Sequence, residues 1–103
     1  MDIETFIEAV RLGFQEKVRR RCKAGLININ AYDSIGWTAA MYAVYNNELY
    51  MLKMLVKYGA DLNIVTKHGH CSSLMIACWW KYNDASLNIM KYLLEDRKST
   101  RLN

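Results

Sequence analysis

A segment near the middle of the chain recurs after 33 residues. Residues 33–43 read DSIGWTAAMYA and residues 67–77 read KHGHCSSLMIA, which places Gly69 33 residues after Gly36. Each copy is followed by an apolar stripe, LYMLKMLV over 49–56 and LNIMKYLL over 87–94. A period of this length is typical of repeat architectures, in which one unit cannot bury its apolar face alone and must stack on neighbours.

The middle copy resembles one complete ankyrin repeat. It has D-x-x-G-x-T at 33–38, two short helical segments and G-A-D-x-N at 59–63. The third copy departs from this pattern by one inserted residue between Gly69 and Ala77, and by about four more around Trp80 to Ser86. Residues 6–30 resemble a degenerate repeat that lacks D-x-x-G-x-T, as expected of a terminal capping unit. The resemblance implies an all-α ankyrin-repeat solenoid of stacked helix-turn-helix units with β-hairpin-like fingers.

The resemblance divides residues 1–95 into a capping repeat at about 3–31, a middle repeat at about 32–64 and a divergent repeat at about 65–95. Within these units, Asn47 is expected to be a helix N-cap. Gly25 and Gly59 stand where left-handed helix ends are needed. Cys22 is expected to be a buried apolar residue. Five methionines at helical spacing are expected in the core: Met41, Met51, Met54, Met75 and Met90.

The last eight residues, DRKSTRLN at 96–103, break the pattern abruptly. They resemble the translation of a widely used short-read sequencing adapter. We therefore expect residues 96–103 to be a non-native tail and the natural protein to continue beyond Glu95, with more repeats. The alternative is an ordinary polar C-terminal tail.

Charge and cysteine content narrow the class of protein. The net charge is +4, and residues 96–103 hold three basic side chains and one acidic one, which leaves +2 for residues 1–95. That excess is too small to indicate a nucleic-acid partner. No apolar run has the length of a membrane helix. Three cysteines without framework spacing favour a reducing compartment. We expect an intracellular protein, in the cytoplasm first and in the nucleus as the alternative.

Neither catalysis nor metal binding is predicted. Ser72 and Ser73 lie near His68 and His70 in sequence, but no acid completes a triad. The alternative zinc set of His68, His70, Cys71 and Cys78 has neither C-x2-C nor H-x3–5-H spacing. We therefore expect no enzyme activity, no metal and no cofactor.

One basic cluster, KVRRRCK over 17–23, admits two interpretations. It is either a nuclear localisation or nucleic-acid patch, or the solvated face of an outer helix whose Val18 and Cys22 point inward at i, i+4. The second interpretation is favoured.

Residues that contact a partner can be carried over from the family resemblance. In ankyrin repeats such contacts come from the fingers and the exposed end of the first helix of each unit. In this sequence those positions are Arg11 and Leu12 in the capping repeat, and Ser34, Ile35, Trp37, Tyr45, Asn46, Lys67, His68, His70, Trp79 and Trp80 in the other two. Aromatic side chains beside an isoleucine are typical of binding hot spots. The alternative is that tryptophans turn inward, with Trp79 and Trp80 most affected by the insertion.

The resulting functional prediction is a non-enzymatic, monomeric scaffold that binds another protein through its concave finger and inner-helix surface. One alternative is the N-terminal recognition segment of a larger, truncated protein such as an ankyrin-fused kinase, ligase or channel. Another is a nuclear or nucleic-acid-associated role through the basic cluster.

Overall fold

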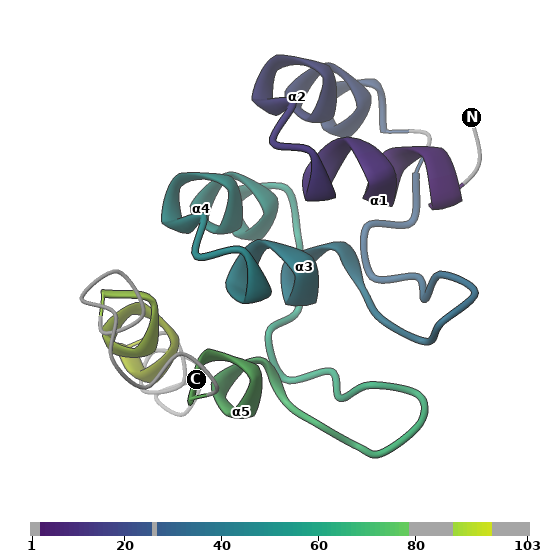
Figure 1. Cartoon of the computed structure of the whole chain (residues 1–103). Coiled ribbons are helices and arrows are strands. Elements are labelled where there is room, and N and C mark those ends of the chain that lie inside the picture. Colours follow the sequence, from purple (N-terminus) through teal and green to yellow (C-terminus); the bar gives the residue numbers. More distant parts are fainter. Residues whose placement is uncertain (1–2, 26, 79–87, 96–103) are drawn as a thin grey trace.

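The computed structural model describes residues 3–25, 27–78 and 88–95, and these residues form helices and loops without a β-strand. The helices are α1 (Ile3–Arg11), α2 (Gln15–Ala24), α3 (Ala39–Tyr45), α4 (Leu49–Lys57) and α5 (Ser73–Cys78). Residues 88–95 form one further helix, the yellow-green ribbon in Figure 1. The predicted all-α stack of helix pairs is confirmed.

The helices form two layers. In the inner layer, α3 packs against α1 on one side and α5 on the other, and in the outer layer α2 packs against α4. Within a unit, α1 pairs with α2 and α3 pairs with α4. Two long loops, before α3 and before α5, project from the same side of the inner layer (Figure 1). These loops are the predicted fingers.

The core lies between the layers and between successive units. Short apolar stripes build it because i, i+3 and i+4 positions share one face of a helix. In α4, for example, Met51, Leu52, Met54 and Leu55 are buried. The largest fully buried side chains are Phe6, Ile7, Val10, Val18, Met41, Val44, Met51, Leu52, Leu55, Thr66, Ile76 and Ile89.

Two side chains predicted to be buried are not. Met75 is 51% exposed, because α5 turns Ser73, Ile76 and Ala77 inward and so points Met75 away from the core. Cys22 is only half-buried although Val18, one turn earlier, is fully enclosed. Of the other methionines, Met41, Met51 and Met54 are buried as predicted, and Met90 is half-buried.

Three helices end in the same hydrogen-bonded turn. After α4, the N–H of Gly59 donates to the carbonyl oxygen of Val56 and that of Ala60 donates to Leu55, at 3.0 Å each. This is the Schellman motif, which needs a residue with positive φ at its turn. Gly59 has φ +104° there, and Gly13 has φ +79° after α1. Gly25 is left-handed at the end of α2, so both predicted glycine helix ends are confirmed.

The third Schellman turn ends α3 and corrects the expectation for Asn47. Asn47 has φ +57°, and its N–H donates to Val44 at 3.1 Å while that of Glu48 donates to Ala43 at 2.9 Å. Asn47 therefore ends α3 and does not cap α4. The cap residue of α4 is Glu48, which makes no side-chain cap hydrogen bond. Asparagine tolerates the left-handed region better than most residues, which explains its place here.

Several predictions lie outside the described residues. These are the environments of Trp79 and Trp80, the insertion at 80–86, and the origin of residues 96–103. The boundaries given to the three repeats, and the non-native origin of the last eight residues, stay predictions.

Candidate functional site

The first finger is organised around the carboxylate of Asp33. The Oδ1 atom accepts hydrogen bonds of 2.9–3.0 Å from the backbone N–H groups of Ile35, Gly36 and Trp37. The N–H of Asp33 in turn donates to the carbonyl oxygen of Trp37 at 2.9 Å. An aspartate that accepts from the backbone two to four residues ahead fixes a tight turn. Asp33 and Gly36, which has φ +95°, thus act as turn residues.

The second oxygen of Asp33 ties the finger to the inner layer. Its Oδ2 accepts a hydrogen bond of 2.6 Å from the hydroxyl of Tyr42 on α3. Burial alone raises the pKa of Asp33, but the hydrogen bonds from Tyr42 and the three N–H groups outweigh it and hold that pKa below its ordinary value. Burial, followed by the hydrogen bond to Asp33, raises the pKa of Tyr42. Asp33 is therefore charged and Tyr42 neutral at pH 7.

The second finger uses a threonine where the first uses an aspartate. Thr66 is 2% exposed, its N–H donates to the carbonyl oxygen of Cys71 at 2.8 Å, and its Oγ1 accepts from the N–H of Cys71 at 2.9 Å. The hydroxyl donates to the carbonyl oxygen of His68 at 2.8 Å. The corresponding pair in the first finger joins Asp33 to Trp37, so this loop is one residue longer. His70, with φ +52°, lies in the lengthened part.

The two fingers contact each other directly. The N–H of Lys67 donates to the carbonyl oxygen of Gly36 at 2.9 Å, and the hydroxyl of Tyr32 donates to the carbonyl oxygen of Val65 at 2.6 Å. A Cβ atom on Gly36 would lie 2.8 Å from the Cβ of Lys67. Only glycine permits both this approach and the positive φ. On the other side, the first finger is held to α1 by a hydrogen bond from the N–H of Ser34 to Glu4.

An aromatic cluster lies where the first finger meets the inner helices. The ring centroid of Trp37 is 5.1 Å from that of Tyr42 and 5.8 Å, edge to face, from that of Tyr45. The guanidinium of Arg11 lies 5.6 Å from the ring centroid of Tyr42. Asn46 donates from Nδ2 to the carbonyl oxygen of Arg11 at 3.1 Å. We call these five residues the inner-face cluster.

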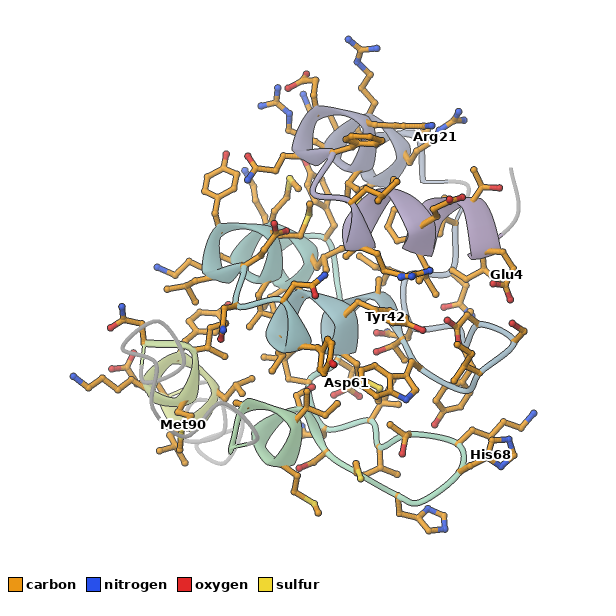
Figure 2. The ribbon with its side chains drawn as sticks, viewed as in Figure 1. Glu4, Arg21, Tyr42, Asp61, His68 and Met90 are labelled. Atoms are coloured by element: carbon orange, nitrogen blue, oxygen red, sulfur yellow. The ribbon has the colours of Figure 1, made fainter. Side chains whose placement is uncertain are left out.

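The structure brings most of the predicted partner-contacting residues to one side of the stack. Ile35 is 62% and Tyr45 41% exposed. Figure 2 shows His68 at the far end of the second finger, away from the helical layers. Trp37 is half-buried, so it offers only part of its ring. The other described members of the set are all exposed: Arg11, Leu12, Ser34, Asn46, Lys67, His68 and His70.

Sequence patterns did not reveal three residues that support this surface. Glu4 and Tyr42 bond to the first finger from outside the D-x-x-G-x-T motif, and Thr66 stands at the aspartate position of the second finger, where the motif has another residue type. The only signal for Thr66 is its spacing, since it follows Asp33 by the 33-residue period.

Neither a metal centre nor a membrane span is seen in the part of the chain that the structure describes. Among the side chains that the structure describes, which do not include that of Cys78, no group of three or more histidine, cysteine, aspartate or glutamate residues is placed to hold an ion. None of the helices there is long and apolar enough to cross a membrane.

Cys22 and Cys71 are free thiols, and burial raises the pKa of Cys22.

Stacked helix pairs with loops projecting from the inner layer define a helical repeat protein. The family model for ankyrin repeats matches residues 6–103 with three copies. This chain therefore belongs to the ankyrin-repeat family, and the sequence-based recognition of that family is confirmed.

The sequence identity to individual curated proteins is about one third. The chain is 31% identical over 99 residues to the human Notch-regulated ankyrin repeat-containing protein, covering 90% of this chain and 80% of that protein. It is 33% identical over 89 residues to the mouse protein phosphatase 1 regulatory subunit 27, covering 86% of this chain and 54% of that one. Ankyrin repeats are protein–protein interaction modules.

Proposed function

We propose that this protein is a non-enzymatic scaffold that binds another protein through the concave surface made by its fingers and inner helices. The observation that carries the proposal is the inner-face cluster, flanked by the exposed Ile35 on a finger fixed by Asp33. The proposed contact residues are those predicted from the sequence, namely Arg11, Leu12, Ser34, Ile35, Trp37, Tyr45, Asn46, Lys67, His68 and His70, together with Trp79 and Trp80, which lie outside the described residues.

The mechanism is preorganisation. Binding costs less when loops and side chains are already held in the bound arrangement. In the first finger, Asp33 restrains three consecutive N–H groups and Tyr42 anchors its carboxylate. Trp37 and Tyr45 are large and carry few rotatable bonds, so they supply contact area at low entropic cost. Tryptophan, tyrosine and arginine are the residue types enriched in hot spots, and the cluster contains all three.

The setting of the protein is also a proposal. We propose that it is a monomer inside the cell, with the cytoplasm as the preferred compartment. The free thiols of Cys22 and Cys71 support a reducing compartment. A second proposal is that the chain acts as a recognition segment within a larger protein; the mouse phosphatase subunit is itself longer than the matched region, which covers 54% of it.

Site-directed photocrosslinking tests the proposal. A photoreactive phenylalanine replaces Ile35 on the finger or, as a matched control, Leu94 on the helix over 88–95, which is also an exposed apolar residue. In lysate of the source organism, we expect one protein to crosslink from position 35 and not from position 94. Purified protein phosphatase 1 is a defined first partner to test, in view of the phosphatase relative. Crosslinks from position 94 alone would contradict the proposed surface.

A further inference from the structure

The opposite, outer side of the stack carries a second surface. Where α2 and α4 lie side by side, a groove of about 290 Å³ is lined by Arg19, Tyr50, Lys53, Met54, Lys57 and Tyr58. Four of these residues, at 50, 53, 54 and 57, follow the i, i+3, i+4, i+7 spacing of one face of α4. The groove is therefore built from the outer helices of two successive repeats and shares no residue with the inner-face cluster.

The groove combines an apolar floor, made by Met54 and the rings of Tyr50 and Tyr58, with a basic rim. Met54 is 8% exposed, whereas Tyr50 is 62% exposed. Lys53, Lys57 and Arg19 supply three cations, and no acidic side chain lines the groove. A partner that fits must offer an apolar group to Met54 and the tyrosines, and negative charge to the rim.

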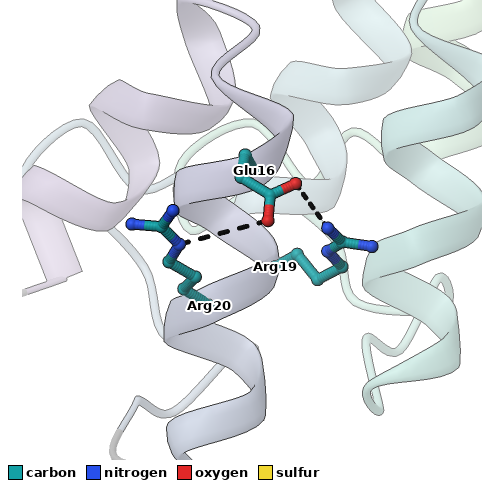
Figure 3. A network of polar contacts seen from close by, with 3 residues as sticks. All are labelled: Glu16, Arg19 and Arg20. Atoms are coloured by element: carbon teal, nitrogen blue, oxygen red, sulfur yellow. Dashed lines mark hydrogen bonds and ion pairs between the residues drawn. The ribbon is translucent and has the colours of Figure 1, made fainter.

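The cations of the rim are available to such a partner. In the described ranges, no carboxylate lies within ion-pair distance of Lys53 or Lys57. Lys57 lies 5.9 Å from the ring centroid of Tyr58, and Lys53 lies 5.8 Å from that of Tyr92. Glu16 holds Arg19 through one guanidinium nitrogen and lies 4.0 Å from the Nε of Arg20 (Figure 3). Since arginine has five N–H donors, Arg19 retains donors for a second carboxylate.

The surroundings strengthen the positive field. Helix α2 carries five basic side chains and one acidic one, and α4 carries two lysines and no acid. A surface lined by one sign of charge attracts oppositely charged ligands and accelerates their association. A basic partner, or the same basic face of a second copy of this chain, would be repelled by these cations.

We propose that the groove between α2 and α4 binds an acidic peptide segment of a partner protein, with carboxylates on Arg19, Lys53 and Lys57 and one apolar side chain against Tyr50 and Met54. This surface is separate from the concave one, so a ligand here leaves the fingers free. The pattern of cations around an apolar floor favours a peptide over a nucleic acid, which would need a longer basic track for its phosphates.

The test uses a labelled glutamate-rich peptide with one central phenylalanine, and fluorescence anisotropy at about 50 mM and about 300 mM salt. Lys53→Glu with Lys57→Glu reverses two charges of the rim, one helical turn apart. Lys17→Glu with Arg21→Glu makes the same change in charge and spacing on α2, in a separate hollow beside Phe14. We expect the first pair to weaken binding roughly tenfold and the control pair less than about threefold, with weaker binding at higher salt.

Three results would overturn the proposal: equal losses for the two pairs, no peptide binding at low salt, or tighter binding of a single-stranded oligonucleotide of equal charge than of the peptide. Replacing the phenylalanine of the peptide by serine is expected to weaken binding to the wild-type protein, and no effect would contradict the apolar floor. Circular dichroism checks that each variant is folded. If the charge-reversal pair does not fold, Lys53→Gln with Lys57→Gln carries the same test, with an expected loss of about threefold.

Ile35→Arg, which lies outside the groove, is expected to leave peptide binding unchanged, and this separates the groove from the proposed function.

Discussion

The hydroxyl of Tyr42 on α3 donates a hydrogen bond of 2.6 Å to the Oδ2 of Asp33 in the first finger. This contact joins α3 of the inner layer to the loop that presents Ile35 and Trp37. Because Oδ1 of the same carboxylate accepts from three backbone N–H groups, the internal shape of the loop and its attachment to α3 depend on one side chain.

Removing the Tyr42 hydroxyl is expected to destabilise the protein. Tyr42→Phe leaves Oδ2 of a charged aspartate without its side-chain donor, and hydrogen bonds to charged groups contribute about 1.5–3 kcal/mol. Since Asp33 is only partly buried, we expect a loss of about 1–2 kcal/mol in the free energy of unfolding, measured by urea denaturation. Tyr50→Phe, at an exposed site, is the control and should cost less than about 0.5 kcal/mol.

The charge of Asp33 predicts a pH dependence. The folded-state pKa of Asp33 is lowered, so its contribution is fully present above the unfolded pKa of about 3.9 and is lost as the pH falls through the folded value. Asp33→Asn should therefore be less stable than the wild-type protein at pH 7. The difference in free energy of unfolding between the wild-type protein and Asp33→Asn should become smaller as the pH falls below about 4. Urea denaturation at several pH values measures this difference. A gap that stays constant from neutral to acidic pH contradicts this role of the carboxylate.

Gly36 is expected to be far less tolerant of a side chain than Gly59. Both have strongly positive φ, +95° and +104°, but a Cβ on Gly36 meets Lys67 at 2.8 Å whereas one on Gly59 meets nothing within 4 Å. Gly59→Ala should cost about 1–2 kcal/mol, the strain of a left-handed alanine. Gly36→Ala adds a displacement of the second finger and should cost at least about 1 kcal/mol more. Equal losses in denaturation experiments would show that the close approach between the fingers is unimportant.

Asn47→Gly is expected to stabilise the protein. Asn47 occupies a left-handed position where the Schellman turns after α1 and α4 have glycine, and its Oδ1 is buried without a hydrogen-bond partner. Removing the strain and the unsatisfied oxygen outweighs the greater freedom of glycine in the unfolded chain. We expect a gain of up to about 1 kcal/mol in thermal or urea unfolding. A loss would mean that the side chain of Asn47 is satisfied by solvent.

Periodicity was sufficient to predict the helices, and glycine spacing predicted two of their ends. Spacing failed where one residue type can serve two purposes. Asn47 is favourable both as an N-cap and in a left-handed turn, and only the tight connection between α3 and α4 decides between them. Met75 was misplaced because a six-residue helix has too few apolar positions to define its buried face from sequence.

The support of the candidate site was harder to predict than its exposed members. Tyr42 lies in the apolar run from Met41 to Val44, a pattern that predicts a core residue and gives no sign that its hydroxyl donates a hydrogen bond to Asp33. Thr66 replaces the aspartate of the motif with a different hydrogen-bond pattern, and the extra residue at the second finger is accommodated by the left-handed His70. Such contacts depend on distances between segments, which a one-dimensional pattern does not contain.

The most direct test of the central claim is the affinity of the crosslinked partner, once purified, for three forms of the chain, measured by isothermal titration calorimetry. The double variant Ile35→Arg with Tyr45→Ala removes an exposed apolar side chain from the finger and an aromatic ring from the inner helix. Leu94→Arg is the control on the helix over 88–95. We predict at least a tenfold weaker affinity, about 1.4 kcal/mol, for the folded double variant and no change for the control. An unchanged affinity of the double variant, or an equal loss for Leu94→Arg, would contradict binding through the concave surface.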